Sequence, residues 1–344
     1  MRMLVVSGYP AWYKVSKQLM PSNHLFGVHE LVDHYEEVGE SIRGILRQDV
    51  FGGGYVDFYL WKSGKKNIIS QVLELKKKST EYDLIFDQLN RCSIFLGIFK
   101  KLGLFKTKLL TVLHHPPYDL QLRVSDSEAY IFFNEDYRCI AEKANPNKKN
   151  RYYVNEWRPD MNWYSNIVNK TEEDTGDIFY IDTGKSRRDR RLLVEAAEKA
   201  CIRVDYAADQ NGEEGYARPY AIDLKDDVGM VKRILKYKAQ IIPVQENKKH
   251  KIGPLGITSF MDCLALGRPV IASDNVCFAD IIEKYGLGVL YKTGDVDSLV
   301  EAMRTLHEDV TQYYSYQENI RNYNKKNMED CSKILINVIM QMNE

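Results

Sequence analysis

Short apolar segments alternate with amphipathic ones along almost the whole chain, and this alternation starts afresh half-way. Residues 3–6 and 109–113 in the first half, and 178–182 and 239–244 in the second, are apolar runs of strand length, with helix-patterned segments such as 68–78 between them. Strands that alternate with helices form parallel sheets covered by helices on both faces. The sequence therefore predicts the α/β class, with two successive α/β halves.

Two helices are predicted where they affect the architecture. Leu25, Val28 and Leu31 are spaced to share one helical face, which predicts a helix over residues 25–38. A long helix is predicted over residues 316–342, near the end of the chain. The first would follow the opening strand and its loop, and the second would close the second half.

A boundary between the halves is predicted at Trp157–Asp160. This segment interrupts the alternation, and Asn, Asp, Glu and Thr dominate the residues that follow it. A chain of 344 residues also fits two domains, because domains commonly hold roughly 100–200 residues. In such sheets ligands bind at the carboxyl ends of the strands, and two domains leave a cleft between them.

The charge balance argues against one class of function. Lys and Arg number 48, as do Asp and Glu, so the net charge is zero, whereas a dedicated nucleic-acid-binding protein carries a strong basic excess. Residues 1–169 carry a net charge of +4 and residues 170–344 one of −4. The first half is therefore the part expected to favour an anionic surface or substrate.

The cysteines and the first residues predict a cytoplasmic protein. The six cysteines are too far apart for a disulfide scaffold or a zinc site, so reduced thiols are expected. The opening residues have the pattern of a short strand rather than of a signal peptide. The sequence contains no apolar run of about 18 residues, so it predicts no membrane span.

Residues 253–275 contain the first candidate site. Gly256 permits a close approach of the backbone, and Thr258 or Ser259 can cap the helix that follows. The first N–H groups of a helix lack internal partners and carry the positive end of its dipole, so they form a phosphate site without a metal. Asp262, one turn further on, would hold a ribose diol; the alternative is a plain helix–strand unit with an exposed Asp262.

Residues 182–191 form the second candidate site. They follow a predicted strand and precede a helix, and the run contains Gly184, Lys185 and Arg188. Cationic side chains at the carboxyl end of a strand can clamp a diphosphate, and arginine does so with a fork of donors. The alternative is a solvated, charged helix start.

His114 and His115 end the apolar segment 109–113 and form the third candidate site. A histidine at the end of a buried strand can bond a substrate hydroxyl or assist proton movement near neutral pH. No carboxylate stands at a spacing that supports a metal site. The alternative is a histidine that bonds only backbone groups.

Residues 95–108 interleave aromatic and aliphatic residues with four lysines, a pattern that suits a membrane interface. The alternative is a helix that faces the core and is followed by a basic turn. We favour the alternative for the helix face and retain the lysines as candidate contacts with the inner face of a membrane.

Several segments together resemble a known family. Residues 262–273 are similar to E-A-M-A-x-G-x-P-V-I-A-S, and residues 183–189 to G-R-x-x-R-D with Lys185 in the arginine position. Residues 157–164 are similar to the interdomain hinge W-G-x-D-x-x-x-Y, and residues 22–27 to a loop near the donor phosphates. Over nearly its whole length, the chain resembles the retaining family-four GT-B glycosyltransferases of bacterial polysaccharide synthesis.

This resemblance implies a GT-B fold, with two Rossmann-like, doubly wound domains that face a central cleft. Residues 1–162 would form the acceptor domain and residues 163–317 the nucleotide-sugar donor domain. The final helix, about residues 318–344, would pack back on the acceptor domain. Closure of the cleft about the segment 157–164 would exclude water.

The resemblance also implies a hexosyltransferase that needs neither metal nor cofactor and retains anomeric configuration. It would move a sugar from a nucleotide-diphosphate donor, expected to be linked to UDP, to the hydroxyl of a glycan, lipid-linked or protein-linked acceptor. The implied catalytic residue is His114, with His115 as its substitute. The implied donor-binding residues are Gly27, Gly184, Lys185, Arg188, Gly256, Ile257, Thr258, Ser259 and Asp262.

One departure from the family pattern keeps two alternatives open. Asp262 stands in place of the second glutamate of the family's pair, and Pro254 stands where the first is expected. A non-catalytic GT-B subunit of a glycosyltransferase complex is therefore an alternative. A sugar-nucleotide epimerase, which shares this fold, is another.

Overall fold

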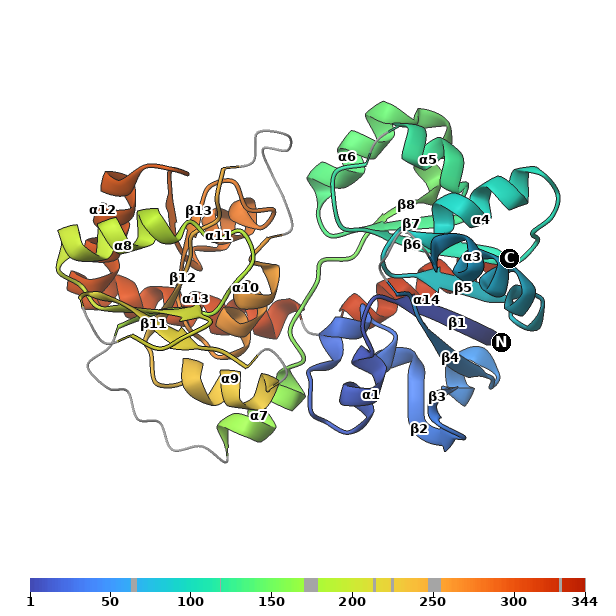
Figure 1. Cartoon of the computed structure of the whole chain (residues 1–344), viewed down its shortest axis with the longest axis horizontal. Coiled ribbons are helices and arrows are strands. Elements are labelled where there is room, and N and C mark those ends of the chain that lie inside the picture. Colours follow the sequence, from blue (N-terminus) through green and yellow to red (C-terminus); the bar gives the residue numbers. More distant parts are fainter. Residues whose placement is uncertain are drawn as a thin grey trace. The chain divides into compact units, whose positions relative to one another are not determined.

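The computed structural model describes residues 1–62, 67–117, 119–169, 179–212, 215–223, 226–246, 255–327 and 330–343. The chain divides into two compact units (Figure 1). Unit 1 comprises Met1–Trp157 and Glu329–Glu344, and unit 2 comprises Arg158–Met328. The chain therefore passes from unit 1 to unit 2 after Trp157, within the segment whose composition predicts the boundary.

The described strands of unit 1 form one sheet in the order β2-β3-β4-β1-β5-β6-β7-β8. The pairs from β4 to β8 are parallel, and β2 and β3 form an antiparallel hairpin at the β4 edge. The strands are β1 (Arg2–Ser7), β2 (Val32–Val38), β3 (Ser41–Leu46), β4 (Tyr55–Leu60), β5 (Leu84–Asp87), β6 (Lys108–Leu113), β7 (Ala129–Phe132) and β8 (Tyr152–Val154).

Helices α3 to α6 each connect one parallel strand to its successor, and each connection moves across the sheet in the same direction. Because such crossovers are right-handed, these helices lie on one face of the sheet. The α-helices of unit 1 are α1 (Ala11–Ser16), α2 (Gln48–Phe51), α3 (Ile68–Lys78), α4 (Cys92–Lys101), α5 (Asp119–Ser125), α6 (Glu135–Ala144) and α14 (Asp330–Asn343). Its short 3₁₀ turns are η1 (Ser22–Leu25), η2 (His29–Leu31), η4 (Ser79–Glu81) and η5 (Pro146–Arg151).

The helix predicted over residues 25–38 is wrong. Leu25, Val28 and Leu31 are all fully buried, but Leu25 ends the 3₁₀ turn η1, Val28 precedes η2 and Leu31 ends η2, and β2 follows at once. The spacing of three that suggested an α-helix also fits a 3₁₀ turn, in which side chains three apart share a face. Gly39, at a φ of +61°, opens the two-residue turn to β3 instead of ending a helix.

The described strands of unit 2 are parallel and have the order β11-β10-β9-β12-β13-β14. This is the doubly wound Rossmann order, in which the strand order reverses between the first and the fourth strand. Here the reversal falls between β9 and β12. The strands are β9 (Tyr180–Asp182), β10 (Val204–Ala208), β11 (Ala217–Ala221), β12 (Ala239–Ile242), β13 (Val270–Ser273) and β14 (Gly288–Tyr291).

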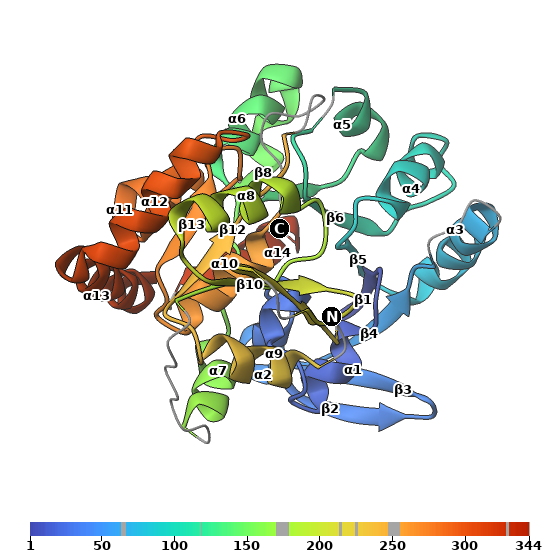
Figure 2. The same cartoon turned by 60° about the vertical axis from the view of Figure 1, so that its left-hand side comes forward.

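Helices α8 and α12 pack together over this sheet around Leu193 and Met303, and α7 packs with α9 in a second cluster around Trp163 (Figure 2). The helices of unit 2 are α7 (Met161–Val168), α8 (Arg190–Ala200), α9 (Asp227–Ile234), α10 (Ile257–Ala265), α11 (Ala279–Tyr285), α12 (Val296–Glu308) and α13 (Val310–Asn327). In the described part of the chain, no helix has both the length and the apolar character needed to cross a membrane.

The long terminal helix predicted over residues 316–342 is two helices. Helix α13 belongs to unit 2, where it buries Ile320 and Tyr323, and α14 belongs to unit 1, where it buries Leu335 and Ile339. The apolar residues of α13 belong to the core of unit 2 and those of α14 to the core of unit 1. The two segments therefore do not form one continuous amphipathic helix.

Candidate functional site

A buried ion network lies at the carboxyl end of β9, where the strand order of unit 2 reverses. Asp182 ends this strand and is fully buried. Its carboxylate accepts hydrogen bonds from the guanidinium groups of Arg188, at 3.2 Å, and of Arg190. The backbone N–H of Gly184 also donates to Asp182, at 2.9 Å. The carboxylate therefore orients both arginines.

Arg188 joins this network to the start of α10. Its Nη2 donates to Ser259 Oγ at 3.3 Å, and Ser259 Oγ lies 3.1 Å from Thr183 Oγ1. A Cβ added to Gly184 would lie 2.1 Å from Nη2 of Arg188, so only glycine leaves room for the guanidinium. Two segments that the sequence analysis singled out, residues 182–191 and 253–275, thus meet at Arg188, although the Arg188 side chain is only 4% exposed.

Gly256 begins α10 with a φ of +85°, which glycine adopts without strain. A Cβ at this position would lie 2.4 Å from Ile242 Cγ2 and 3.8 Å from Arg188 Nη2. The turn therefore packs directly beside the arginine. Ile257 is partly exposed and Thr258 exposed, so the first turn of α10, with its unpaired N–H groups, reaches the surface of unit 2.

Lys185 takes a different position from Arg188. Its Nζ donates to Asp209 at 2.7 Å, beyond the end of β10. Among the contacts of the described residues, Lys185 has none with the α10 turn. Of the two cations predicted to clamp a diphosphate, the structure brings only Arg188 to the start of α10.

Asp262 lies on α10 and accepts a hydrogen bond from the hydroxyl of Tyr164 at 2.6 Å. The pKa of Asp262 is raised to about 7, chiefly by burial; the bond from Tyr164 opposes the rise, and the nearby Asp227 adds to it. Its Oδ2 has no hydrogen bond with another described residue. The carboxylate is therefore placed to accept from a second hydroxyl, but it holds Tyr164 in the absence of a ligand.

The sequence analysis missed Gln240, a fully buried residue of β12. Its Oε1 accepts from Thr183 Oγ1 at 3.2 Å, while its Nε2 has no hydrogen-bond partner in the described part of the chain. A buried donor without an acceptor is costly, so this amide adds an unused donor beneath the network. A polar residue inside an otherwise apolar strand was the signal that could have found it.

In unit 1 the uncharged residues Gln88 and His114 follow the carboxyl ends of β5 and β6, although β5 itself ends at the buried Asp87. His114 follows β6, and its Nε2 lies 2.5 Å from the carbonyl oxygen of Gln88, which follows β5. A carbonyl only accepts, so Nε2 carries the proton and Nδ1 of the neutral ring is an acceptor. Burial lowers the pKa of His114, which keeps the ring neutral near pH 7.

An aromatic cluster surrounds this histidine. The ring of His114 is edge-on to Phe26 and Phe133, at centroid distances of 5.2 and 5.0 Å. Phe26 stacks on Trp157 at 5.2 Å, and Trp157 donates its indole N–H to the carbonyl of Asn23. The first residue of the predicted hinge is thus fixed within unit 1.

Four amide oxygens near this cluster are buried and have no hydrogen-bond partner among the described residues. They belong to Asn23, Gln88, Asn90 and Asn155. Gln88 follows β5 and Asn155 follows β8, so both lie at the carboxyl edge of the sheet. Because a buried acceptor without a donor is costly, these oxygens are suited to a ligand rich in hydroxyl or amide hydrogens. Amide residues directly after parallel strands were the signal that sequence reasoning overlooked.

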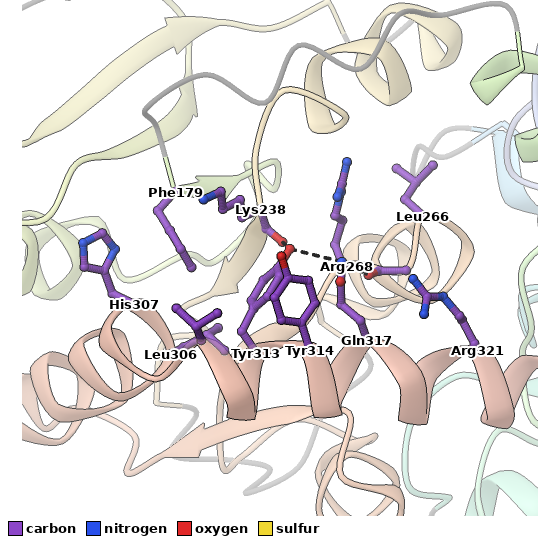
Figure 3. Close-up of a pocket in the computed structure, with 12 residues that line it drawn as sticks. Phe179, Lys238, Leu266, Arg268, Leu306, His307, Tyr313, Tyr314, Gln317 and Arg321 are labelled. Atoms are coloured by element: carbon purple, nitrogen blue, oxygen red, sulfur yellow. Dashed lines mark hydrogen bonds between the residues drawn. The ribbon is translucent and has the colours of Figure 1, made fainter.

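A separate cavity of about 500 Å³ opens at the other edge of the unit 2 sheet (Figure 3). It is lined by Phe179, Lys238 and Arg268, which precede β9, β12 and β13, and by residues of α13. Tyr313 of α13 donates to the carbonyl of Lys238 at 3.2 Å. This cavity lies at the amino ends of the strands and is distinct from the network at Asp182.

No protein-family model and no curated protein sequence matches the chain. Solved structures do match. The Anabaena protein HepE, solved with UDP-glucose, shares 13% identity over 100% of this chain and 99% of its own, with a TM-score of 0.66. Sucrose-phosphate synthase from Thermosynechococcus elongatus shares 11% over 99% of each chain, with a TM-score of 0.64.

A Listeria monocytogenes protein assigned as a UDP-N-acetylglucosamine 2-epimerase shares 11% identity over 92% of this chain and 91% of its own, with a TM-score of 0.55. The chain has the GT-B fold. The fold class expected from the sequence is thereby confirmed.

The two remaining predicted site residues of this GT-B chain are Gly27 and His115. Gly27 has a φ of +89°, and a Cβ on it would lie 3.0 Å from Leu335 of α14, so it packs against the final helix. His115 is exposed, in contrast to the half-buried His114. Pro254, the departure from the family's first glutamate, lies outside the described residues.

In the ranges that the structure describes, no group of three His, Cys, Asp or Glu side chains is placed to hold a metal ion.

Proposed function

We propose that the protein is a glycosyltransferase that transfers a sugar from a nucleotide-diphosphate donor, linked to UDP, to a hydroxyl acceptor. One observation carries this proposal. At the strand reversal of the unit 2 sheet, the buried Arg188 and the first turn of α10 meet beside Gly256. That is where doubly wound sheets bind phosphorylated ligands, and this chain has the GT-B fold.

Unit 2 would stabilise the departing diphosphate. The N–H groups of Ile257, Thr258 and Ser259 have no partners within α10, and the helix dipole favours negative charge there. Arg188, held by Asp182, adds a fixed positive charge beside them. Groups oriented in advance stabilise developing charge because they do not have to reorganise during the reaction.

Unit 1 would bind neutral hydroxyl groups. Nδ1 of His114 is an acceptor on a ring whose other nitrogen is fixed by Gln88. The unpartnered oxygens of Asn23 and Asn155 are further acceptors. A sugar offers several O–H donors, so it would satisfy groups that the folded chain leaves without partners.

The finer features of the proposal rest on the family resemblance. They are retention of anomeric configuration, activity without a metal ion, and a glycan, lipid-linked or protein-linked acceptor of bacterial surface polysaccharide synthesis. The protein would act at the cytoplasmic face of a membrane. The anomeric proton of the product, followed by NMR, tests retention.

Calorimetric titration with UDP-glucose tests the donor site, with Asp262 as the reporter. An ionised Asp262 accepts hydrogen bonds from a ribose, so affinity should rise as pH increases through about 7. Asp262→Asn should lower the affinity and remove this pH dependence. Tyr164→Phe is the matched control: the bond from Tyr164 lowers the pKa of Asp262, so its loss should move the midpoint upward. Absence of binding at every pH would refute the proposal.

Product analysis separates the alternatives. A transferase releases UDP and forms a glycoside when an acceptor is supplied. An epimerase alters the nucleotide sugar without any acceptor, and a non-catalytic subunit binds UDP-glucose without releasing UDP. Either of the last two results would replace the proposed function.

A further inference from the structure

Six large apolar side chains are exposed on one surface of unit 1. They are Ile69, Leu73, Phe95, Ile98, Leu102 and Leu104, and they define the α3–α4 surface. Ile69 is 77% exposed and Leu102 is 65% exposed. Single exposed apolar residues are ordinary, whereas a contiguous group of them marks an interaction site.

The two helices that carry this surface lie side by side (Figure 2). Lys76 of α3 lies over the ring of Phe99 of α4, with its Nζ 5.6 Å from the centroid. The inward residues Val72, Leu75 and Leu96 already supply the core beneath the helices. The outward apolar residues are therefore not needed to attach α3 and α4 to the sheet.

The sequence analysis assigned the helix face within residues 95–108 to the core, which is correct for some of its apolar residues and wrong for others. Leu96 is fully buried, but Phe95 and Ile98 on the same helix point to solvent. Of the four lysines in the segment, Lys100 pairs with Glu128. Lys101 and Lys108 donate to backbone carbonyls, those of Arg123 and Met342.

Three other lysine positions give the α3–α4 surface a positive charge. Lys76, Lys77 and Lys106 have no ion-pair partner among the described residues. Lys76 and Lys106, with Lys108, line a cavity of about 590 Å³. Leu104 lines the same cavity, so cationic and apolar groups are adjacent there.

Carboxylates lie in the same region. Glu74 pairs with Lys78 at 3.1 Å, and Asp83, in the cavity wall, pairs with Arg2 at 3.4 Å. Glu81 also lies there, exposed at the end of the 3₁₀ turn η4 that follows α3. Lysine charges therefore exceed carboxylate charges across the surface.

We propose that the α3–α4 surface binds an anionic lipid bilayer, with its apolar side chains in the interface and its lysines against lipid phosphates. Interfacial binding requires apolar area together with attraction to anionic headgroups, and this surface supplies both. A second copy of the chain is a poorer occupant, because a twofold contact would set these lysines against themselves. The inference deepens the proposed location at a membrane face by naming the surface that binds it, while the observations on this surface do not depend on the donor site.

Vesicle flotation of the full chain tests the inference. Vesicles of phosphatidylcholine alone are compared with vesicles that also contain phosphatidylglycerol, at low and at high salt. The chain should float with the anionic vesicles at low salt, and less of it should float at high salt. Leu102→Glu combined with Leu104→Glu should lower binding at least tenfold.

Matched controls lie on unit 2. Val310 is 62% exposed, so Val310→Glu changes an exposed apolar residue elsewhere and should leave binding unchanged. Lys77→Gln and Lys106→Gln should each weaken binding about fivefold, since one lysine near an anionic surface contributes about 1 kcal/mol. Lys292→Gln, an exposed lysine of unit 2, should have no effect.

Three results would overturn the inference. They are no flotation with anionic vesicles, equal flotation with uncharged vesicles, and a dimer in light scattering that Leu102→Glu with Leu104→Glu dissociates. Titration with UDP-glucose on the same variants shows whether they are folded. A wild-type chain that floats but binds no UDP-glucose would refute the proposed function and leave this inference standing.

Discussion

The two units carry groups of opposite character at the same edge of similar sheets. In unit 2 the strand ends hold charge, with Asp182 and Arg188 beside the start of α10. In unit 1 they hold a neutral His114, aromatic rings and amide oxygens such as that of Asn155, while the carboxylate of Asp87 at the end of β5 is buried and accepts from Ser93. The parallel topology is shared, so the difference arises from the residues that follow each strand. One architecture thus provides one half suited to an anionic diphosphate and one suited to neutral hydroxyls.

Removing the charge from unit 2 should have the largest effect. Arg188→Ala leaves Asp182 buried beside a single arginine, so the free energy of unfolding should fall by about 3–5 kcal/mol. Urea denaturation measures this change. Arg321→Ala removes an exposed ion pair with Glu318 and should cost less than about 1 kcal/mol. Equal stability of the two variants would show that the network does not support unit 2.

Acidification should move the two units in opposite directions. Burial, with a smaller effect of Lys14, lowers the pKa of His24 in unit 1 to about 4. Between about pH 6.5 and pH 4, His24 is protonated in the unfolded chain but stays neutral in the folded chain. The free energy of unfolding of unit 1 should therefore fall by about 2–3 kcal/mol as pH falls through this range. Asp262 in unit 2 has a raised pKa of about 7. The folded chain keeps its proton between about pH 4 and pH 7, so unit 2 should gain stability as pH falls.

Hydrogen exchange at pH 7 and pH 5, corrected for intrinsic rates, resolves the two units separately. His24→Gln should reduce the loss in unit 1, to which the lowered pKa of His114 also contributes, and Asp262→Asn should remove the gain in unit 2. Parallel changes in both units would contradict the assignment of these two groups.

Closing the space at the α10 turn should weaken donor binding. In Gly256→Ala the new Cβ meets Ile242 Cγ2 at 2.4 Å and the backbone is strained, so affinity for UDP-glucose should fall at least about tenfold, or 1.4 kcal/mol. Gly267→Ala, at the other end of α10, is the matched control. Its φ is +62°, and nothing lies within 4 Å of the added Cβ. Similar affinities for the two variants would remove the turn from the donor site.

The smallest effect on stability is expected in unit 1. Asn155→Leu removes an amide oxygen that has no described partner, so the free energy of unfolding should change by less than about 1 kcal/mol. Transfer to acceptor should nevertheless fall about tenfold, since one hydrogen bond to the sugar is lost. Urea denaturation measures the first change and steady-state kinetics the second. A large loss of stability with unchanged transfer would assign Asn155 a structural role.

Local patterns predicted the scaffold well. The apolar segments 109–113 and 239–244 correspond to β6 and β12, and the helix over 68–78 is α3. These predictions succeed because burial between two layers of helices requires continuous apolar strands. The failure at residues 25–38 shows the limit: three apolar residues at a spacing of three do not distinguish an α-helix from consecutive 3₁₀ turns.

The site was predictable only in part, because partners distant in sequence decide what a side chain does. The run around Arg188 was found, but its burial depends on Asp182 and Ser259 together. Lys185 has the same charge and lies three residues away, yet Asp209 holds it elsewhere. The side chain of Gln88 stands out only because its Oε1 receives no hydrogen bond from a described residue, and a sequence pattern cannot predict this.

The discontinuity of unit 1 has a consequence for biosynthesis. Its core includes Leu335, Val338 and Ile339 of α14, which leave the ribosome after all the residues of unit 2. Domains generally fold as units while translation proceeds. Unit 2 can therefore complete its fold first, and the unit that begins earlier along the chain must wait for α14 before its core is complete.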